Sequence, residues 1–282
     1  MCRQLHQEGC AVHTTSRRYR MGDGVRWWQA DLADLAATRQ LISAIEPDII
    51  FHLAGAVGAG PQVGLVRPTY DSLLSSSVNL LVASADNPSR RIIFAGSMTE
   101  PAADAAEPVP SSPYAAAKWA SCAYARMFHR LYGTPVVIVR AFMTYGPGQA
   151  PEKLVPFVIR SLLANEAPKL SSGRFRADWI YVADVIDGFV KAATAQGIEG
   201  QTFDLGTGEL RSIRSLVTEI ASAMNSEIKL QFGAVPDRPN EREWAATLLP
   251  AVRLRWAPTT PLKEGLRQTV AWYREARHAT AI

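Results

Sequence analysis

Short apolar runs that alternate with helix-like segments are the feature that most limits what this chain can fold into. The clearest run, residues 48–54 (DIIFHLA), stops at Gly55, and such a run is typical of a parallel strand covered on both faces. Alternation of strands and helices with short connections predicts an α/β fold with a doubly wound, Rossmann-like parallel sheet. Further strands are expected at residues 11–15, 91–95 and 135–139, and helices at residues 32–45, 73–85 and 113–132.

The alternation loosens after residues 146–148 (GPG), where longer loops and helices follow. We therefore expect a larger first domain at residues 1–146 and a smaller C-terminal lobe at residues 147–282. A strand and helix around residues 177–206 are predicted to return to the first domain.

Composition narrows the class of protein. The 282 residues are 48% hydrophobic and 20% charged, which is ordinary for a globular protein with a sizeable core. The apolar stretches are too short to cross a membrane, and the N-terminus has no apolar run of signal-peptide type. Three scattered cysteines without metal-ligand spacing indicate reduced thiols, no metal site and a cytoplasmic location. The net charge of +4 suits an anionic substrate, and without a Lys/Arg tract no nucleic-acid partner is expected.

Tyr114 and Lys118 stand four residues apart in SSPYAAAKWA, at the start of an expected helix. This spacing puts both side chains on one helix face. A phenol is a poor base at neutral pH, and a neighbouring cation that stabilises phenolate lowers its pKa. Tyr114 is therefore a candidate to accept a proton from an alcohol.

Ser97 follows the expected strand at residues 91–95, at the sheet edge where active-site residues of open α/β sheets collect. Its hydroxyl could bridge a substrate oxygen and Tyr114. A serine at a strand end, followed by Tyr-x-x-x-Lys in a βα chain, is much more specific than the Tyr–Lys pair alone.

The order of motifs resembles the NAD-dependent epimerase/dehydratase family, which belongs to the extended short-chain dehydrogenases/reductases and modifies nucleotide-linked sugars. The resemblance covers essentially the whole chain. It rests on HLAG, FAGSMTE, PYAAAK, VRAFMTYGPGQ, KLVP, SSGRFRADWIYVADV, FDLGTG, RPNERE and a closing PTTPLKEGL segment with a Trp-Tyr helix.

The resemblance implies roles for individual residues and for the two domains, the first binding a dinucleotide and the second mainly the substrate. Ser97, Tyr114 and Lys118 would be catalytic, and Tyr114 and Lys118 would also contact the cofactor, the lysine at the nicotinamide ribose. The other implied cofactor contacts are Asp31, Leu32, Leu53, Ala54 and Gly55. The implied nucleotide-sugar contacts are Lys153, Leu154, Arg176 and Arg238. Arginine forks pair well with diphosphate oxygens.

Several polar residues have competing interpretations. Glu100 resembles an acidic position that sugar 4,6-dehydratases use, but those enzymes usually carry an adjacent Asp, and a strand-end surface carboxylate is the preferred interpretation. Thr99 is a reserve for the hydroxyl role of Ser97. His52, inside an apolar run, is interpreted as a packed core histidine. Asp178, Tyr181 and Asp184 are expected to brace the returning strand and its helix.

The chain departs from the family pattern at its beginning. Relatives start with a buried strand and a Gly-x-x-Gly-x-x-Gly turn that binds the cofactor pyrophosphate, whereas Met1 here stands inside the expected first helix. We expect that about 20 preceding residues are missing, the size of one strand and turn. The alternative is a true truncation that binds no dinucleotide.

Two further departures concern specificity. Met143 and residues 245–246 (AA) stand where many relatives have Asn and Asp, which puts the details of sugar recognition in doubt. Arg17 and Arg18 follow the strand at residues 11–15, with no acidic residue to bind a ribose 2′-hydroxyl. Arginines there favour a 2′-phosphate and so NADP over NAD, although a pair of surface arginines is nearly as good an explanation.

The resulting prediction is an NAD(P)-dependent enzyme that acts on a nucleotide-linked sugar as an epimerase or 4-ketoreductase, and as a homodimer by resemblance. The first alternative is a 4,6-dehydratase that uses Glu100. The second is a non-catalytic protein that keeps the fold.

Overall fold

A computed structural model describes residues 1–20, 24–58, 60–87, 89–101, 108–237, 243–248 and 250–280. The chain divides into two compact units. The first unit comprises Met1–Arg140 and Phe189–Phe203, and the second comprises Ala141–Gly188 and Asp204–Ile282. The assignment of cofactor binding to one domain and substrate binding to the other stays a prediction.

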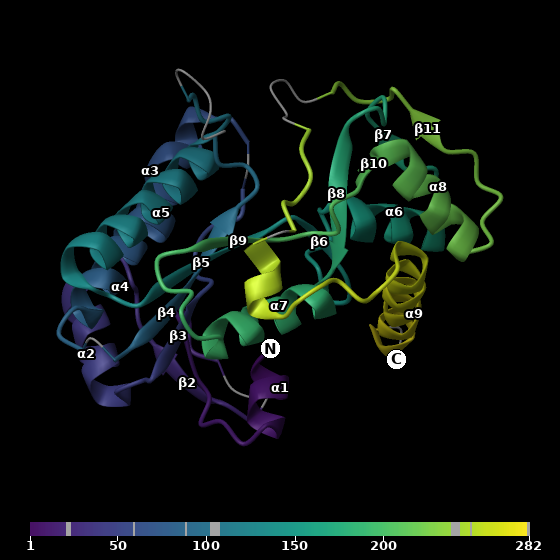
Figure 1. The fold of residues 1–282 in the computed structure, drawn as a ribbon. Coiled ribbons are helices and arrows are strands. Elements are labelled where there is room, and N and C mark those ends of the chain that lie inside the picture. Colours follow the sequence, from purple (N-terminus) through teal and green to yellow (C-terminus); the bar gives the residue numbers. More distant parts are fainter. Residues whose placement is uncertain are drawn as a thin grey trace. The chain divides into compact units, whose positions relative to one another are not determined.

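The first unit alternates strands and helices along the chain (Figure 1). Its elements are α1 (Cys2–Gln7), β1 (His13–Ser16), β2 (Arg26–Gln29), α2 (Leu35–Ile45), β3 (Ile49–His52), η1 (Val63–Leu65), α3 (Val66–Thr69), η2 (Tyr70–Ser75), α4 (Ser76–Ser84), β4 (Arg91–Ser97), α5 (Pro113–Tyr132) and β5 (Val136–Ala141), followed later by the end of α7 (Val182–Thr194) and by β9 (Thr202–Leu205).

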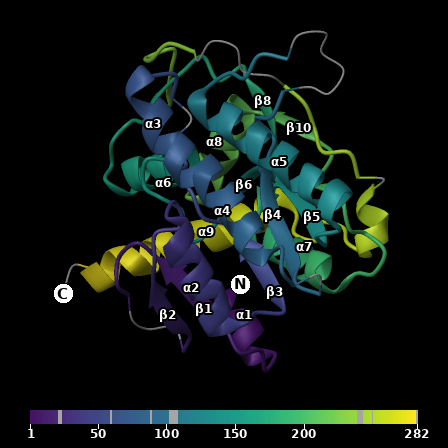
Figure 2. The same cartoon turned by 90° about the vertical axis from the view of Figure 1, so that its left-hand side faces the viewer.

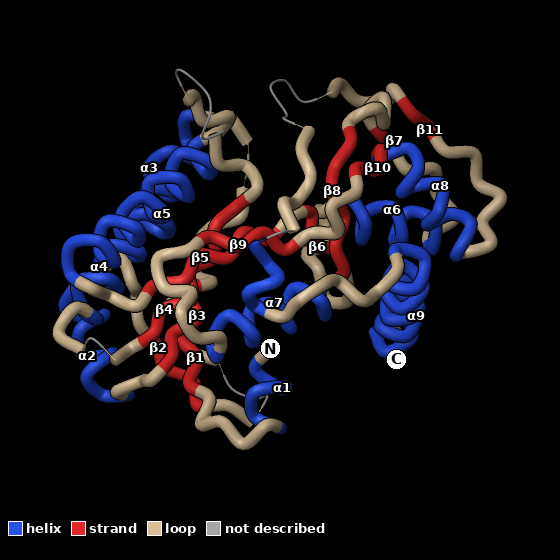
Figure 3. The backbone as a smooth tube through the Cα atoms, in the orientation of Figure 1, coloured by secondary structure: helices blue, strands red, loops and turns tan. Residues whose placement is uncertain are grey.

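The parallel strands confirm the predicted Rossmann-like α/β fold. One sheet has the order β3-β4-β5-β9, and a separate two-stranded sheet joins β1 to β2. The β3–β4 pair is parallel and runs from Ile49 opposite Arg91 to His52 opposite Phe94. Helices α2, α4 and α5 cover one face of the larger sheet, which Figure 2 shows from that side, and Figure 3 marks its strands in red.

A buried apolar cluster joins this sheet to its helices. Ile92 and Phe94 of β4 and Ile138 of β5 pack against Leu81 of α4 and Phe128 of α5. Because the consecutive residues Ile92, Ile93 and Phe94 are at most 1% exposed, β4 is held firmly in the layer below the helices. The end of β4, where Ser97 lies, is therefore attached to a well-packed part of the unit.

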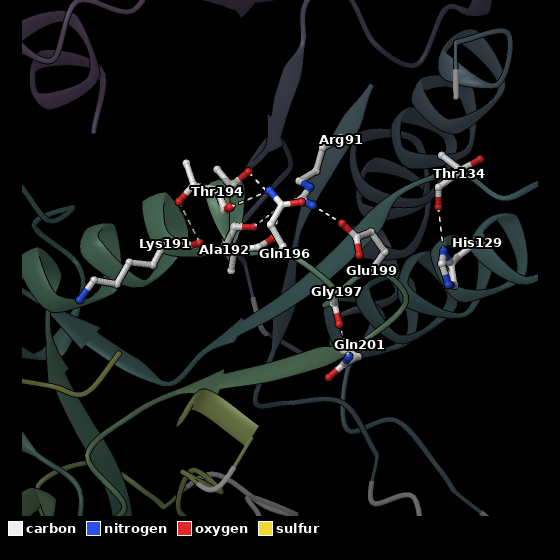
Figure 4. A network of polar contacts seen from close by, with 12 residues as sticks. Arg91, His129, Thr134, Lys191, Ala192, Thr194, Gln196, Gly197, Glu199 and Gln201 are labelled. Atoms are coloured by element: carbon white, nitrogen blue, oxygen red, sulfur yellow. Dashed lines mark hydrogen bonds and ion pairs between the residues drawn. The ribbon is translucent and has the colours of Figure 1, made fainter. Parts of the chain in front are cut away.

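Arg91, at the start of β4, fastens the end of α7 to the same sheet (Figure 4). Its guanidinium donates to the carbonyls of Ala193 at 3.1 Å and Ala195 at 2.5 Å and forms an ion pair with Glu199. The last carbonyls of a helix have no partner within the helix, so this side chain satisfies groups that would otherwise be orphaned.

The structure also differs from the expected elements. The strand β2 was not expected from the sequence, and it pairs in parallel with β1 from His13 opposite Arg26. Helix α2 begins at Leu35 rather than at residue 32, because the Asp34 carboxylate caps it by accepting from Ala36 N–H at 2.8 Å and Ala37 N–H at 3.1 Å. The expected helix at residues 73–85 is the end of a longer helical segment that includes the π-helical η2.

The second unit is a smaller sheet with helices around its own core. Its three-stranded sheet has the order β10-β8-β6, and a second pair joins β11 to β7. Its elements are β6 (Met143–Tyr145), α6 (Leu154–Leu163), β7 (Lys169–Leu170), β8 (Arg176–Tyr181), most of α7, β10 (Leu210–Ser212), α8 (Ile213–Ala223), β11 (Gln231–Phe232), η3 (Pro250–Leu254) and α9 (Leu262–Thr280). Among the described helices, none is long and apolar enough to cross a membrane.

Candidate functional site

Helix α5 positions two of the three predicted catalytic side chains. It begins at Pro113, whose ring suits the first helical position, and the Ser112 hydroxyl accepts a hydrogen bond from Ala115 N–H at 3.2 Å. Tyr114 therefore lies in the first turn of α5, at the positive end of the helix dipole. Lys118 follows one turn later and is 8% exposed.

The third residue, Ser97, ends β4 and meets these side chains in the first unit. The Ser97 side chain lies near enough to the phenol of Tyr114 to act to lower the phenol pKa. The Lys118 ammonium donates to the carbonyl of Ala95, two residues before Ser97, at 2.8 Å. The structure thus brings together the strand end and the helix face that the spacing predicted.

The direction of the Tyr114 pKa corrects one expectation. We expected Lys118 to lower this pKa, but burial raises the pKa of Tyr114 above its ordinary value, and the nearby Ser97 side chain only partly opposes the rise. Burial also lowers the pKa of Lys118, against smaller effects of Cys122 and Glu100 that raise it. The Lys118 ammonium donates a hydrogen bond to the Ala95 carbonyl. Loss of water on burial is the largest influence on the pKa of both Tyr114 and Lys118.

Thr99 and Glu100 form a tight turn with Ser97. The hydroxyl oxygens of Ser97 and Thr99 are 2.9 Å apart, and Thr99 N–H donates to the Ser97 hydroxyl at 3.2 Å. The Glu100 carboxylate lies inward, with only 3% of its side chain exposed. Interpretation of Glu100 as a surface carboxylate is therefore wrong, because its side chain is buried and Ser97 N–H and Cys122 Sγ donate to it.

His52 is a core histidine, as its apolar surroundings in the sequence indicated. It is 3% exposed, and its Nε2 lies 2.9 Å from the Ser77 hydroxyl of α4. Burial, together with the nearby Lys118 charge, lowers the pKa of His52 to about 3. The ring is consequently neutral at physiological pH, and its interactions are those of packing.

The predicted cofactor residues of the first unit lie after the ends of β1, β2 and β3. Arg17 and Arg18 directly follow β1, and both are exposed. Asp31 follows β2 and accepts from Ala33 N–H at 3.0 Å, and the Leu32 carbonyl accepts from Asn79 Nδ2 at 2.9 Å.

The turn after β3 contains Leu53, Ala54 and Gly55. Gly55 has a φ of +140°, and a Cβ there would lie 1.9 Å from Leu73 Cδ2. Only glycine fits this position without a rearrangement. The chain therefore passes close to η2 at this turn.

These positions fit part of a nicotinamide dinucleotide. Exposed guanidinium groups and an Asp-containing turn suit a phosphorylated or free ribose, and Ser97, Tyr114 and Lys118 suit the nicotinamide ribose and a reacting oxygen. The sequence contains no Gly-x-x-Gly-x-x-Gly turn for the pyrophosphate, so these residues would suit the two ends of the cofactor and not its middle.

The predicted sugar-nucleotide residues belong to the second unit. Lys153 is the N-cap of α6 and Leu154 its first residue. Arg176 begins β8, and its N–H donates to the Glu243 carboxylate at 2.8 Å. Arg238 lies outside the described residues.

Two buried aspartates brace β8 and the start of α7, as predicted, although both residues belong to the second unit. Asp178 accepts from the N–H groups of Thr207 at 2.7 Å, Gly208 at 2.9 Å and Ala246 at 3.0 Å. Asp184 accepts from the N–H groups of Thr259 and Thr260, both at 3.1 Å. Such carboxylates hold neighbouring loops through charge-assisted hydrogen bonds. Tyr181 was also predicted to brace this region, and its hydroxyl donates a hydrogen bond to Gln268 Oε1 at 2.8 Å.

Sequence reasoning missed two residues of α5 that contact the site. Cys122 donates to the Glu100 carboxylate at 3.3 Å, and the Arg126 guanidinium lies 3.9 Å from its other oxygen. The signal was available, since residues 114, 118, 122 and 126 continue a four-residue spacing along one helix face.

Comparisons with known proteins identify a family and several relatives. A family model described as "NAD dependent epimerase/dehydratase family" matches residues 1–206. UDP-glucose 4-epimerase of Mycolicibacterium smegmatis is 30% identical over 270 residues, which cover 89% of this chain and 84% of that protein. dTDP-D-glucose 4,6-dehydratase of Mus musculus is 28% identical over 266 residues, which cover 89% of this chain and 74% of that protein.

A solved structure shows the same fold. UDP-glucose 4-epimerase of Thermus thermophilus, in complex with NAD, matches with a TM-score of 0.85 and 24% identity. The match covers 97% of this chain and 94% of that chain.

Proposed function

Since the chain belongs to the NAD-dependent epimerase/dehydratase family, we propose that it acts on a nucleotide-linked sugar as an NAD(P)-dependent epimerase or 4-ketoreductase. The observation that carries this proposal is the hydrogen bond from the Lys118 ammonium to the Ala95 carbonyl at 2.8 Å, which joins the Tyr114–Lys118 face of α5 to the strand that ends at Ser97. The arrangement places one hydroxyl, one phenol and one ammonium at the carboxyl end of β4, which is the edge where parallel sheets bind ligands.

Each of the three side chains has a distinct task in this proposal. Ser97 orients the reacting oxygen of the sugar by a hydrogen bond, and Tyr114 exchanges a proton with that oxygen. Lys118 binds ribose hydroxyls and stabilises the phenolate when it forms. The nicotinamide supplies the hydride chemistry, while the chain supplies positioning and electrostatics.

The raised pKa of Tyr114 means that the phenol of the resting site is protonated. A phenol with a raised pKa keeps its proton at neutral pH, so it is ready to donate to a carbonyl oxygen. The opposite transfer, from an alcohol to the phenolate, depends on Lys118 and on the positive end of α5 to stabilise the anion.

The substrate class follows from the second unit and from the relatives. Matched proteins are named for UDP-glucose and dTDP-glucose, both of which carry a diphosphate. Lys153, Arg176 and Arg238 supply cations that suit diphosphate oxygens. Arg17 and Arg18 favour NADP over NAD on the cofactor side. A homodimer in the cytoplasm stays a prediction.

A sugar 4,6-dehydratase is the second candidate, because several relatives are named dTDP-glucose 4,6-dehydratase. It would need Glu100 to exchange a proton with the sugar. Burial of the Glu100 side chain and its bonds to Ser97 and Cys122 weigh against this role. Formation of a 4-keto-6-deoxy product that stops in Glu100→Gln would favour the dehydratase.

Replacing Tyr114 by Phe tests the proposal. Tyr114→Phe should lower kcat by about 10²- to 10⁴-fold, because the proton donor is lost. Binding of UDP-glucose or dTDP-glucose, measured by calorimetry, should stay within about twofold, since the phenol is not expected to carry ground-state affinity. Turnover is followed with both sugars, with NAD(H) or NADP(H), by product analysis.

Tyr124→Phe is the matched control, because Tyr124 lies on the same helix and is 41% exposed. It should leave turnover unchanged. Near-normal rates in Tyr114→Phe would show that the catalytic assignment is wrong.

A further inference from the structure

The turn after β4 is closed by a reciprocal pair of hydrogen bonds between Ser97 and Glu100. Ser97 N–H donates to Glu100 Oε1 at 2.9 Å, and Glu100 N–H donates to the Ser97 carbonyl at 3.2 Å. Both hydrogen bonds involve the backbone of Ser97. The conformation of Ser97, whose hydroxyl is proposed to orient the reacting oxygen, is therefore set by Glu100.

The same carboxylate reaches α5. Cys122 Sγ donates to Glu100 Oε1 at 3.3 Å, and Arg126 Nη2 lies 3.9 Å from Glu100 Oε2. Burial and the adjacent Glu100 raise the pKa of the Cys122 thiol well above its ordinary value, so the thiol keeps its proton and remains a donor. One buried carboxylate thus bonds both to the strand end with Ser97 and to the helix with Tyr114 and Lys118.

Space for this carboxylate depends on a glycine of β4. A Cβ at Gly96 would lie 2.9 Å from Glu100 Oε1 and 2.7 Å from Arg140 Cγ of β5. Contacts this short force a neighbour to move, so a side chain at this position would displace the carboxylate. The local sequence Gly96-Ser97 is what lets Glu100 fold back beneath the strand end.

We propose that Glu100 is a positioning residue, whose buried carboxylate holds Ser97 in register with the Tyr114–Lys118 face of α5. This inference rests on the proposed function and assigns Glu100 no proton exchange with substrate. A buried carboxylate that already accepts from a backbone N–H and a thiol is costly to disturb, because its charge would lose its partners.

The charge of Glu100 also acts on the proton-transfer group. The groups that influence Tyr114 are Ser97 on β4, Glu100 in the turn, and Cys122 on its own helix. Glu100 raises the pKa of Tyr114 and also that of Lys118, because a nearby negative charge disfavours phenolate and favours ammonium. A neutral side chain of the same shape should therefore lower the pKa of Tyr114.

Two variants separate the parts of this role. In Glu100→Gln the amide oxygen can still accept from Ser97 N–H, while the charge is gone. In Glu100→Ala both are lost. Glu46→Gln is the matched control, because Glu46 is an exposed carboxylate of the same unit.

The titration midpoint of Tyr114 distinguishes this role from a purely structural one, because a purely structural role would leave it unchanged. It is followed by ¹³C NMR of chain labelled at the tyrosine Cζ, with the Tyr114 signal identified by its absence in Tyr114→Phe. Glu100→Gln should shift the Tyr114 midpoint to lower pH and move the limb of the kcat/KM profile that reports Tyr114 the same way, the alkaline limb for ketone reduction and the acidic limb for alcohol oxidation. Its kcat should stay within about tenfold of the wild type, because the amide can keep Ser97 in place.

In Glu100→Ala, kcat should fall about 10- to 100-fold with a smaller change in KM, as expected for misplaced reacting groups. Wild-type kcat in Glu100→Ala, or an unchanged Tyr114 midpoint in Glu100→Gln, would overturn the proposal. So would a Glu100→Gln variant as inactive as Tyr114→Phe, because that result assigns Glu100 to proton transfer. If the wild type converts no nucleotide sugar, the proposed function fails, and the Tyr114 midpoint still decides the role of Glu100.

Discussion

Loss of water is the strongest influence on the titratable residues near Ser97. It raises the pKa of Tyr114 and lowers those of Lys118 and His52, so each group is pushed toward its neutral form. For the two predicted catalytic residues this means that the site as described favours a protonated phenol. For His52 it means that a neutral ring is part of the stability of the first unit.

The stability of the protein should accordingly fall with acid through His52. Its pKa is lowered from 6.5 to about 3 on folding, so the unfolded chain binds a proton between these pH values and the folded chain does not. Unfolding is therefore favoured as the pH falls through this window, by about 2 kcal/mol at pH 5 relative to pH 8.

Urea denaturation at pH 8 and pH 5 measures this contribution. His52→Gln should remove about 2 kcal/mol of the difference, and His6→Gln, at an exposed position, should leave it unchanged. An equal pH dependence in the wild type and in His52→Gln would contradict the prediction.

At the scale of elements, helix α5 carries two of the predicted catalytic side chains and also the side chains that contact Glu100. Tyr114 and Lys118 are followed at the same spacing by Cys122 and Arg126, which contact Glu100. The helix is anchored at its start by the Ser112 cap and at its end by Gly133, whose φ is +70°. A change at the cap should therefore affect both stability and turnover.

Ser112→Ala should lower the free energy of unfolding by about 1 kcal/mol, because Ala115 N–H loses its acceptor. It should also lower kcat, since Tyr114 lies in the turn that frays. Ser112→Thr keeps a capping hydroxyl and is the control. Denaturation and steady-state kinetics of both variants check this, and a Ser112→Ala variant equal to the wild type in both would show that the cap is dispensable.

At the scale of the whole molecule, the chain is two units, each with its own buried cluster. In the first unit, the predicted cofactor residues follow strands of both parallel sheets. Arg17 and Arg18 follow β1 of the smaller sheet, and Leu53, Ala54 and Gly55 follow β3 of the larger one. The proposed binding of a dinucleotide would therefore need both sheets of the first unit, so the full chain should be titrated.

Fluorescence titration of the 282-residue chain with NADPH and NADH should show tighter binding of NADPH. Replacing Arg17 and Arg18 together by Gln should weaken NADPH binding by roughly tenfold and leave NADH nearly unchanged, because only NADPH carries the 2′-phosphate. Arg39→Gln, at an exposed arginine of α2, is the control. Equal weakening of both cofactors would refute the 2′-phosphate assignment, and no binding of either to the folded chain would favour the non-catalytic alternative.

The sequence alone was sufficient for the features that depend on local spacing. Apolar runs with turn residues between them predicted the α/β class and the 113–132 helix, because burial on a sheet and helical periodicity leave direct marks on the chain. A spacing of four residues likewise predicted that Tyr114 and Lys118 share one face. Strand β2 escaped because its four residues, RWWQ, have exposed polar ends and only two half-buried positions.

Only the tertiary structure decided where the Glu100 carboxylate points and whether the pKa of Tyr114 is raised or lowered. Nothing near Glu100 in the sequence indicates that its carboxylate turns inward, because its partner Cys122 is 22 residues away on α5. The sign of the Tyr114 pKa shift likewise depends on how much water the fold removes, and no spacing rule contains that quantity. Local periodicity is written in the chain, whereas desolvation and long-range hydrogen bonds arise only when β4 and α5 pack together.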